Sequence, residues 1–322
     1  MITMAKARTY IPVIGFKNFA PRTPALLNGG PLRFAWVNQT SMWPFHMPKA
    51  AAVYQHGGGP FVPPRIMAAC RLLGRPIVKH WLGSDVMRAN DPLVQAQNAT
   101  GQIVHWANSP WLAAELAQAG IEAQTVSNLG SDGMVLPLPP GLLTVLTFLP
   151  SFDFYGGQDV LALARALPDV RFLVVANDGR NAPHEPNIEY LGYRNDMREV
   201  YERCHLLFRM PQHDGKSRMV CEALAYGRHV IWNYPMVGSR LATTRPLAAA
   251  LLRRFDDELR AGRLAPNQLG HDYIAAHEST SAVRDEILHA MTQTIEKWST
   301  SRQAFWSSRD LSRPARSFAD VL

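Results

Sequence analysis

The sequence predicts an α/β protein made of two doubly wound, Rossmann-like domains that face each other across a cleft. Short apolar runs typical of buried strands alternate with helical runs along most of the 322 residues. The alternation stops at a proline-rich stretch, residues 135–142, and then starts again. A stretch of this composition is typical of a linker between domains. Each half is therefore expected to form one parallel sheet with helices on both faces.

The first half is expected to contain six strands and three helices, because its short apolar runs are separated by helical or polar segments. The strands are expected at residues 9–15, 32–37, 51–54, 76–81, 102–106 and 123–126, and the helices at 23–27, 63–73 and 110–119. The second helix begins at a proline, which the first turn of a helix tolerates. The third is followed by Gly120, a usual helix stop.

The second half repeats this pattern and is followed by a tail. Strands are expected at residues 143–148, 171–176, 188–192, 206–208 and 229–232, and helices at 157–167, 196–204, 246–260 and 281–300, with one more helix between the last two strands. The predicted domains are residues 1–138 and 139–304. The tail, residues 305–322, is expected to pack back on the first domain.

Composition limits the class of protein and its partners. An apolar fraction of 47% with only 18% charged residues predicts a packed globular chain. None of the three cysteines forms a C-x-x-C pair, which fits a reducing cytoplasm and does not indicate a zinc site. No apolar run approaches the length of a membrane span. The sequence therefore predicts a cytoplasmic protein.

The net charge of +7 is spread along the chain. Such an excess suits an acidic small molecule, the inner face of a membrane or nucleic acid. No basic helix is interleaved with aromatic residues in the way nucleic-acid modules require. We therefore expect no nucleic acid partner, while a peripheral membrane contact stays open, as does a simply solvated surface.

The most informative stretch is residues 213–227, which lies between two predicted strands and places a polar loop before a helix. Open α/β sheets bind ligands at this position, and helix N-termini favour phosphate. Asp214 and Glu222 stand eight residues apart, about 12 Å along a helix. Ionised carboxylates accept hydrogen bonds from sugar hydroxyls. The alternative is that Asp214 caps the helix and Glu222 is solvated.

These residues resemble the retaining glycosyltransferases of the GT-B fold, in the group often called family 4. Residues 187–193, 197–204 and 214–227 carry the resemblance, and Asp214-x7-Glu222 takes the place of that family's E-x7-E motif. Weaker likeness covers residues 76–85 and 108–121. The resemblance implies that Asp214 holds the hydroxyls of the donor sugar and Glu222 holds the donor ribose. It places Tyr193 and Arg194 near the nucleobase.

One departure from that family concerns the donor diphosphate. The family offers an arginine and a lysine near the start of the second domain, whereas residues 151–159 contain no cation here. Negative charge that develops on the leaving diphosphate must be stabilised. Lys216 and Arg218 at the helix start are the candidates, together with the amides of Gly215 and Ser217, and Arg209 at the preceding strand end is another. Surface charge is the alternative for these cations.

The first half is expected to supply the acceptor side. His80 follows a strand, and the resemblance makes it a candidate for contact with donor sugar or acceptor; a histidine held in a strand-end hydrogen-bond network is the alternative. His56 and Gly57 belong to a glycine-rich turn that permits close approach to the backbone or is a plain turn. Gly15 and Asp85 complete the set.

The resemblance implies transfer with retained anomeric configuration, from a nucleotide-diphosphate sugar to a glycan, lipid-linked or small-molecule acceptor. No bound cofactor and no metal are expected, since a D-x-D motif is absent. A non-catalytic nucleotide-sugar-binding partner of a glycan-assembly complex is the alternative that the missing cation pair favours. A GT-B nucleotide-sugar epimerase is another.

Overall fold

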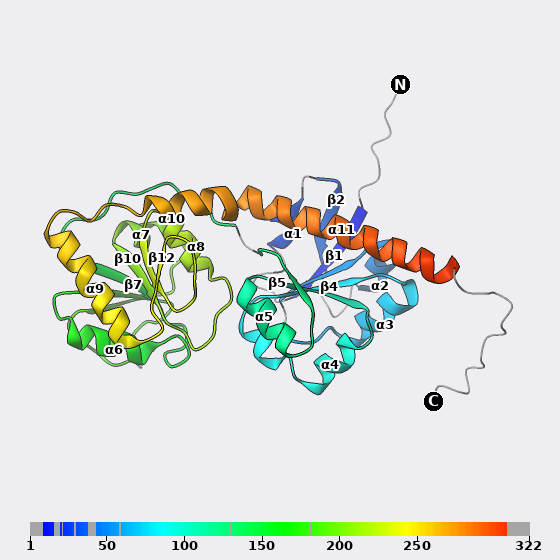
Figure 1. Cartoon of the computed structure of the whole chain (residues 1–322), viewed down its shortest axis with the longest axis horizontal. Helices are drawn as coiled ribbons and strands as arrows, with labels where there is room; N and C mark the ends of the chain where they lie inside the picture. The colour runs from blue at the N-terminus through cyan, green and yellow to red at the C-terminus, as the bar shows by residue number, and fades with distance from the viewer. Residues whose placement is uncertain are drawn as a thin grey trace, which may run out of the picture.

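The computed structural model describes residues 9–15, 20, 22–28, 30–37, 43–57, 59–128, 130–180 and 182–307. Figure 1 shows two α/β domains side by side, with the long helix α11 (Thr280–Ser307) running from their junction along the first domain. Each domain is built on a six-stranded sheet. All strand pairs are parallel in both sheets. The prediction of two doubly wound α/β domains is confirmed.

The sheet of the first domain has the strand order β2-β1-β3-β4-β5-β6. Its strands are β1 (Thr9–Gly15), β2 (Leu32–Trp36), β3 (Val53–His56), β4 (Ile77–Trp81), β5 (Ile103–Ala107) and β6 (Ala123–Thr125). The helices of this domain are α1 (Thr23–Leu27), α2 (Trp43–His46), η1 (Met47–Lys49), α3 (Pro64–Leu73), η2 (Ser84–Arg88), α4 (Pro92–Asn98) and α5 (Pro110–Gln118).

The sheet of the second domain has the order β12-β11-β10-β7-β8-β9. Its strands are β7 (Thr144–Phe148), β8 (Arg171–Val175), β9 (Ile188–Gly192), β10 (Leu206–Arg209), β11 (His229–Trp232) and β12 (Ser239–Leu241). The helices are α6 (Gly157–Ala166), α7 (Arg198–Glu202), α8 (Arg218–Ala225), α9 (Arg245–Arg260), α10 (Gln268–Tyr273) and the π-helical turn η3 (Ile274–Glu278).

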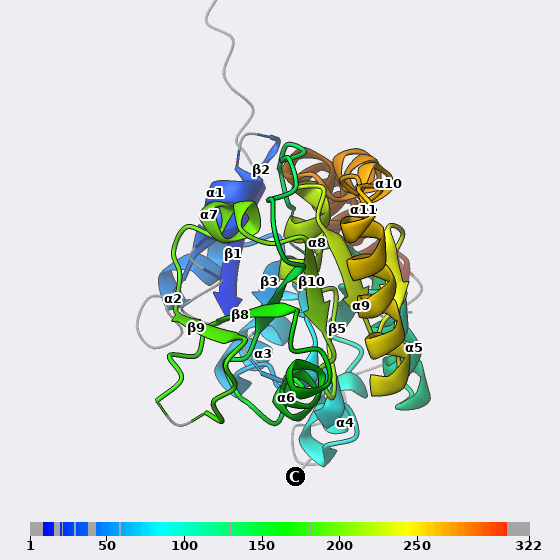
Figure 2. The same ribbon diagram turned by 90° about the vertical axis from the view of Figure 1, so that its left-hand side faces the viewer.

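Alternation along the strands explains the two helical layers of the second domain. Successive side chains of a strand point to opposite faces of the sheet. Val145 and Phe172 belong to a core with α6 and α9, whereas their neighbours Leu146 and Leu173 belong to a second core with α7 and α8. Figure 2 shows the sheet between these helices. A strand buried on both faces needs apolar residues throughout, which is why these runs are continuous in the sequence.

Helix α11 returns the chain to the first domain. Val283, Ile287 and Met291 are buried in one core with Ile11 and Phe34 of that domain. The boundaries predicted at residues 138 and 304 stay predictions. Most of the tail predicted to pack there, residues 305–322, lies outside the described residues.

The strand order defines one switch point in each sheet, where neighbouring strands send their connections in opposite directions. In the first sheet it lies between β1 and β3, and in the second between β7 and β10. The carboxyl ends of the strands leave a crevice at such a point, which is where open α/β sheets bind ligands. The switch points therefore direct attention to the residues that follow these four strands.

Some predicted boundaries were wrong. The third strand covers residues 53–56 instead of 51–54, and the helix predicted at 196–204 is shorter, Arg198–Glu202. The sequence analysis did not predict α2, α4, α10 or β12. These are short elements of three to seven residues, too short for a periodic apolar pattern to be recognised.

Candidate functional site

Asp214 and Arg209 form an ion pair at the switch point of the second sheet. Arg209 is the last residue of β10, and its Nε donates to Asp214 Oδ2 at 2.6 Å. The side chains are only 7% and 14% exposed. The loop from β10 therefore turns back so that its carboxylate meets the end of its own strand. Helix α8 starts after the N-cap residue Ser217, so Asp214 does not cap it.

Arg209 also lies against the beginning of the second domain. Its guanidinium carbon is 5.5 Å from the ring centre of Phe148, at the end of β7, and 5.2 Å from that of Tyr155. Cation–π contact of this kind holds a guanidinium in place. A cation from β10 thus reaches the region in which residues 151–159 supply none. Of the three cations proposed from the sequence, Arg209 is the one that the fold brings to that region.

Glu222 lies on α8 with two partners. Its Oε1 accepts from Nε of Arg218 at 2.6 Å, and its Oε2 accepts from the Tyr201 hydroxyl at 3.2 Å. The Glu222 side chain is 17% exposed, whereas that of Arg218 is 49% exposed. Burial, and then the Glu222 charge, hold the pKa of Tyr201 well above its usual range, so this phenol remains a donor. The sequence did not indicate Tyr201 as a site residue, because it lies on α7, outside the motif stretch 213–227.

Lys216 faces away from the carboxylates of the motif. Its Nζ lies 2.6 Å from Oε1 of Glu278 and 2.8 Å from Oγ of Ser127. The side chains of Lys216 and Glu278 are 12% and 5% exposed, so this is a buried ion pair. It joins the motif loop, residues 210–217 between β10 and α8, to the turn that leads into α11. In this arrangement Lys216 is not available to a diphosphate, and its predicted role stays a prediction.

The motif loop is also the contact between the two domains. Trp111 Nε1 donates to the Asp214 carbonyl at 2.9 Å, and the Lys216 amide donates to Oδ1 of Asn108 at 3.1 Å. His213 Nε2 lies 2.8 Å from a carboxylate oxygen of Glu115. Thus α5 and the segment just before it meet the loop that carries Asp214.

Gly215 permits this approach. A Cβ added at Gly215 would stand 2.1 Å from the Leu82 carbonyl oxygen, which no real side chain allows. Asn108 bridges the same place, since its Nδ2 donates to Leu82 O at 2.9 Å. The sequence placed Gly215 at the donor diphosphate. The structure brings it against the first domain, and its donor-binding role remains a prediction.

On the first domain, Gly15 and His56 lie together at the switch point. They end β1 and β3 and stand opposite each other in the strand register. A Cβ on Gly15 would meet the His56 carbonyl oxygen at 2.2 Å, so only glycine fits. Gly57 follows with a positive φ of 63°. Three of the four predicted acceptor-side residues therefore gather at the place where a doubly wound domain binds ligands.

The two histidines of this domain that the sequence proposes for the site, His56 and His80, are buried, and burial lowers the pKa of each. His56 receives or donates a hydrogen bond at Nδ1 with the Thr23 hydroxyl, 2.7 Å away, and burial lowers its pKa to about 4. Its Nε2 is buried without a partner among the described atoms. His80 has both ring nitrogens engaged, with Tyr54 Oη at 2.7 Å and the Val126 carbonyl at 2.8 Å. This is the strand-end network that was the alternative to a catalytic contact by His80.

Asp85, the fourth residue predicted on the acceptor side, holds the turn after β4. Its Oδ1 accepts from the amides of Gly83 at 2.9 Å and Leu82 at 3.1 Å. Burial raises its pKa, and the charge of nearby Lys79 opposes that rise. The Asp85 carboxylate therefore shapes the turn that meets Gly215.

Tyr193 and Arg194 follow β9, the edge strand of the second sheet. Tyr193 is 80% exposed and Arg194 is exposed as well. An exposed aromatic ring at the carboxyl end of a strand is open to stacking with a base. Ser217 is buried at the start of α8. No side-chain capping bond is formed by Ser217 in the described structure.

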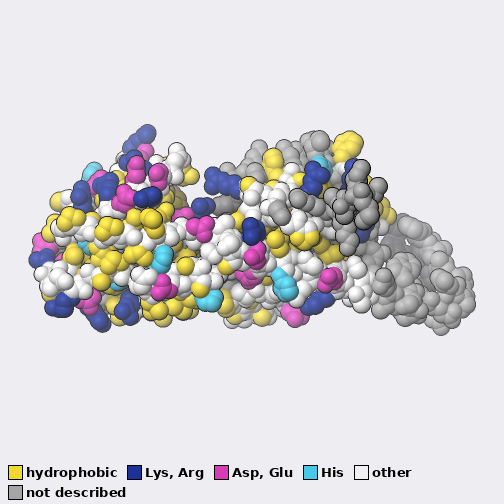
Figure 3. All heavy atoms as spheres, turned by 90° about the horizontal axis from the view of Figure 1, so that it is seen from above, with side chains coloured by type: hydrophobic (Ala, Val, Ile, Leu, Met, Phe, Trp, Pro, Cys, Tyr) yellow, Lys and Arg dark blue, Asp and Glu magenta, His cyan; other side chains and the backbone are white. Residues whose placement is uncertain are grey.

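The described residues contain no group of three or more His, Cys, Asp or Glu arranged to hold a metal ion. Over the same part of the chain, no helix is both long and apolar enough to cross a bilayer. From above, Lys and Arg side chains are interspersed with Asp and Glu over the second domain (Figure 3). That face has the charge pattern of an ordinary solvated surface.

The sequence matches no protein family model. It also matches no curated protein. Solved structures do resemble the fold. HepE from Anabaena, solved with UDP and glucose, has a TM-score of 0.64 at 12% identity, covering 88% of this chain and 99% of its own. A glycosyltransferase from Rickettsia africae has a TM-score of 0.62 at 12% identity, covering 90% and 99%. The pneumococcal O-GlcNAc transferase GtfA, solved with UDP and GlcNAc, has 0.54 at 12%, covering 77% and 56%. The chain shares the two-domain GT-B arrangement with these proteins.

Proposed function

We propose that this protein is a retaining glycosyltransferase that moves a sugar from a nucleotide-diphosphate sugar to a glycan, lipid-linked or small-molecule acceptor. The observation that carries the proposal is the Arg209–Asp214 pair, which stands at the switch point of the second sheet beside the start of α8. A carboxylate for sugar hydroxyls and a cation for a diphosphate are thus held together where such a sheet binds ligands. The similarity to structures solved with UDP and sugars supports the same reading.

In the proposed reaction, Arg209 stabilises the charge that develops on the departing diphosphate. An arginine fixed by a carboxylate and two aromatic rings is already oriented, so little reorganisation accompanies the reaction. Asp214 binds hydroxyls of the donor sugar, and Glu222 binds the ribose with its orientation set by Arg218 and Tyr201. The acceptor hydroxyl attacks on the face from which the diphosphate leaves, without a protein nucleophile.

The acceptor is assigned to the first domain. Gly15, His56 and Gly57 stand at its switch point, where Gly15 packs closely against the His56 carbonyl oxygen. The contact of Trp111 and Asn108 with the motif loop brings the two switch points toward each other. Closure of this kind excludes water, which limits hydrolysis of the donor.

The first experiment is thermal stabilisation by UDP, GDP, ADP and their sugar conjugates. A donor at about one hundred times its dissociation constant should stabilise the protein by about 2.7 kcal/mol. Glu222→Gln should weaken binding about tenfold or more, because a hydrogen bond to a charged group is lost. Glu258→Gln on α9, where Glu258 pairs with Arg254 on the surface, is the matched control and should bind as the unmodified protein does. No stabilisation by any donor would contradict the proposal.

Turnover is measured next by release of the nucleoside diphosphate. Arg209→Gln should lower kcat more than it weakens donor binding, because the charge on the diphosphate grows in the transition state. The anomeric configuration of the product, read by NMR, tests retention. An inverted product would exclude the retaining mechanism while leaving the donor site in place.

One observation favours the non-catalytic alternative. Each cation of the motif is already paired with a carboxylate, Arg209 with Asp214, Lys216 with Glu278 and Arg218 with Glu222. A nucleotide-sugar-binding partner without turnover would show the same donor stabilisation, the same loss in Glu222→Gln and no diphosphate release. The pair of measurements therefore separates the two functions.

A further inference from the structure

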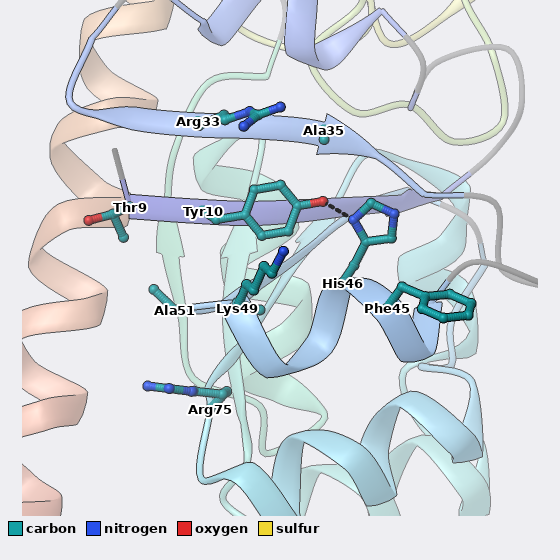
Figure 4. Close-up of a pocket in the computed structure, with 10 residues that line it drawn as sticks. Thr9, Tyr10, Arg33, Ala35, Phe45, His46, Lys49, Ala51 and Arg75 are labelled. Carbon is teal, nitrogen blue, oxygen red and sulfur yellow. Dashed lines mark hydrogen bonds between the residues drawn. The ribbon is translucent and has the colours of Figure 1, made fainter. Parts of the chain in front are cut away.

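A cavity lined by both basic and apolar residues lies in the first domain. It has a volume of about 670 Å³. Figure 4 shows Tyr10, His46 and Lys49 together, with Arg33 and Arg75 on either side of them. The residues that the argument uses are Tyr10, Arg33, Phe45, His46, Lys49 and Arg75.

The basic part of the cavity lies at the amino ends of the strands, and the cavity extends along β2 as far as Ala35. Tyr10 is the second residue of β1, Arg33 the second of β2, and Arg75 stands two residues before β4. Gly15 at the other end of β1 belongs to the switch point. Gly15 lies five positions after Tyr10, about 17 Å at the rise of a β-strand. A ligand in this cavity is therefore distinct from a donor or acceptor at the carboxyl ends.

The side chains that line the cavity carry positive charges and no negative charge. Arg33, Lys49 and Arg75 come from three separate segments, and none of the residues that line it is acidic. None of the three forms an ion pair with a carboxylate of the described residues. Elsewhere in the same domain Arg88 is paired with Asp91. Three cations that line one cavity without an acidic partner repel each other, and a bound anion reduces that repulsion.

Arg75 adds an independent sign of a missing partner. Its Nε is buried and has no hydrogen-bond partner among the described atoms. A buried N–H without an acceptor is costly, so such groups are rare unless a ligand or water completes them. Most of the available backbone donors here are already used, since the amides of Thr9, Ala50 and Ala51 bond to backbone carbonyls. Side chains must therefore make the contacts to a ligand.

Tyr10 and His46 form another polar part of the cavity wall. The Tyr10 hydroxyl is hydrogen-bonded to Nδ1 of His46, and the two rings are stacked. In the tautomer in which the Tyr10 phenol donates to Nδ1, the imidazole proton is on Nε2, which can donate to a ligand. Donors without acceptors are the complement of phosphate oxygens.

We propose that this cavity binds a phosphate group, carried by a soluble phosphate ester or by a lipid headgroup. Arginine forks match the geometry of phosphate oxygens, and Lys49 adds a mobile charge. Phe45 lines the cavity and is 73% exposed, and Leu72, near the end of α3 and three residues before Arg75, is 86% exposed. Exposed apolar side chains beside a phosphate site are what a headgroup at a membrane surface requires.

The test uses two probes on the full chain. Calorimetric titration with glycerol 3-phosphate measures a soluble ester, and cosedimentation with phosphatidylcholine vesicles, with and without phosphatidylglycerol, measures a headgroup. The variants are Arg33→Gln/Lys49→Gln, in which both residues are exposed and the fold is not at risk, and Arg75→Gln, which removes the orphaned donor. Arg65→Gln, exposed in the first turn of the same helix α3, is the matched charge control.

Ester binding that falls about tenfold or more in the variants and is unchanged in the control assigns the site to a soluble phosphate, because each lost contact is to a charged group. Binding only to anionic vesicles, reduced about fivefold for each cation removed and unchanged in the control, assigns it to a headgroup. Equal behaviour of variants and control with both probes overturns the proposal. Stabilisation by the nucleotide-sugar donor, measured on the same variants, should remain, which separates this site from the proposed function.

Discussion

The buried pair of Lys216 and Glu278 allows a quantitative test of how the motif loop is held. The charged atoms are 2.6 Å apart in side chains that are 12% and 5% exposed. The second carboxylate oxygen of Glu278 is already buried without a partner among the described atoms. Lys216→Met keeps the bulk of the side chain and leaves Glu278 as an uncompensated buried charge. We expect this change to lower the free energy of unfolding by about 3–5 kcal/mol.

Replacing both partners should cost less than the sum of the single changes. Lys216→Met with Glu278→Leu removes both charges together, and a hydrophobic pair of similar volume is often tolerated in place of a buried ion pair. We expect a coupling free energy of about 1–3 kcal/mol between the two positions. Unfolding is followed by calorimetry and by circular dichroism in urea for the two single variants and the double variant.

An exposed pair in the same chain is the control. Arg254 and Glu258 are 2.9 Å apart on α9, with side chains 70% and 30% exposed. Arg254→Met should cost less than about 1 kcal/mol. If Lys216→Met costs no more than Arg254→Met, or if the changes at Lys216 and Glu278 are additive, the pair does not hold the motif loop.

Three further outcomes follow from other contacts. Burial lowers the pKa of His56 and of His105 to about 4 from an ordinary 6.5, so as the pH falls the unfolded chain is protonated at these residues before the folded chain is. The free energy of unfolding, measured by urea titration, should therefore fall between pH 7 and pH 5, and by pH 4 the loss should reach about 3 kcal/mol for each histidine. No change over this range would refute the burial of these histidines in the neutral form. Gly15→Ala should lower stability by about 3 kcal/mol by calorimetry, because its Cβ meets a carbonyl oxygen at 2.2 Å, while Gly101→Ala, with nothing within 4 Å, should lose only about 1 kcal/mol. Gly215→Ala should part the motif loop from the first domain, seen as a larger radius of gyration by small-angle scattering; an unchanged radius and unchanged stability would show that the loop gives way without cost.

The sequence by itself determined the elements of both domains. Buried parallel strands need continuous apolar runs, and this requirement is local, so the runs that became β1 and β7 could be read directly. The return of alternating strand-like and helical runs after residues 135–142 likewise indicated the second domain. Elements without such a run, such as β12, were missed because their stability comes from neighbours and not from their own pattern.

The candidate site was predictable only as a set of residue types. The spacing of Asp214 and Glu222 and the missing cation at residues 151–159 were visible, and so were the three candidate cations to replace it. Which cation reaches that region depends on strand order, since β10 lies beside β7 although about sixty residues separate them along the chain. Only the tertiary structure therefore brought Arg209 to Phe148.

The tertiary structure also decided the partner of each charged or polar group. Lys216 meets Glu278, and His80 meets Tyr54 and Val126, across distances in sequence that no local pattern spans. The periodicity of apolar residues along an element indicates which side chains are buried, because burial depends on the face of that element on which a side chain lies. Its hydrogen-bond partner depends on which distant element packs against that face, and packing alone settles that choice.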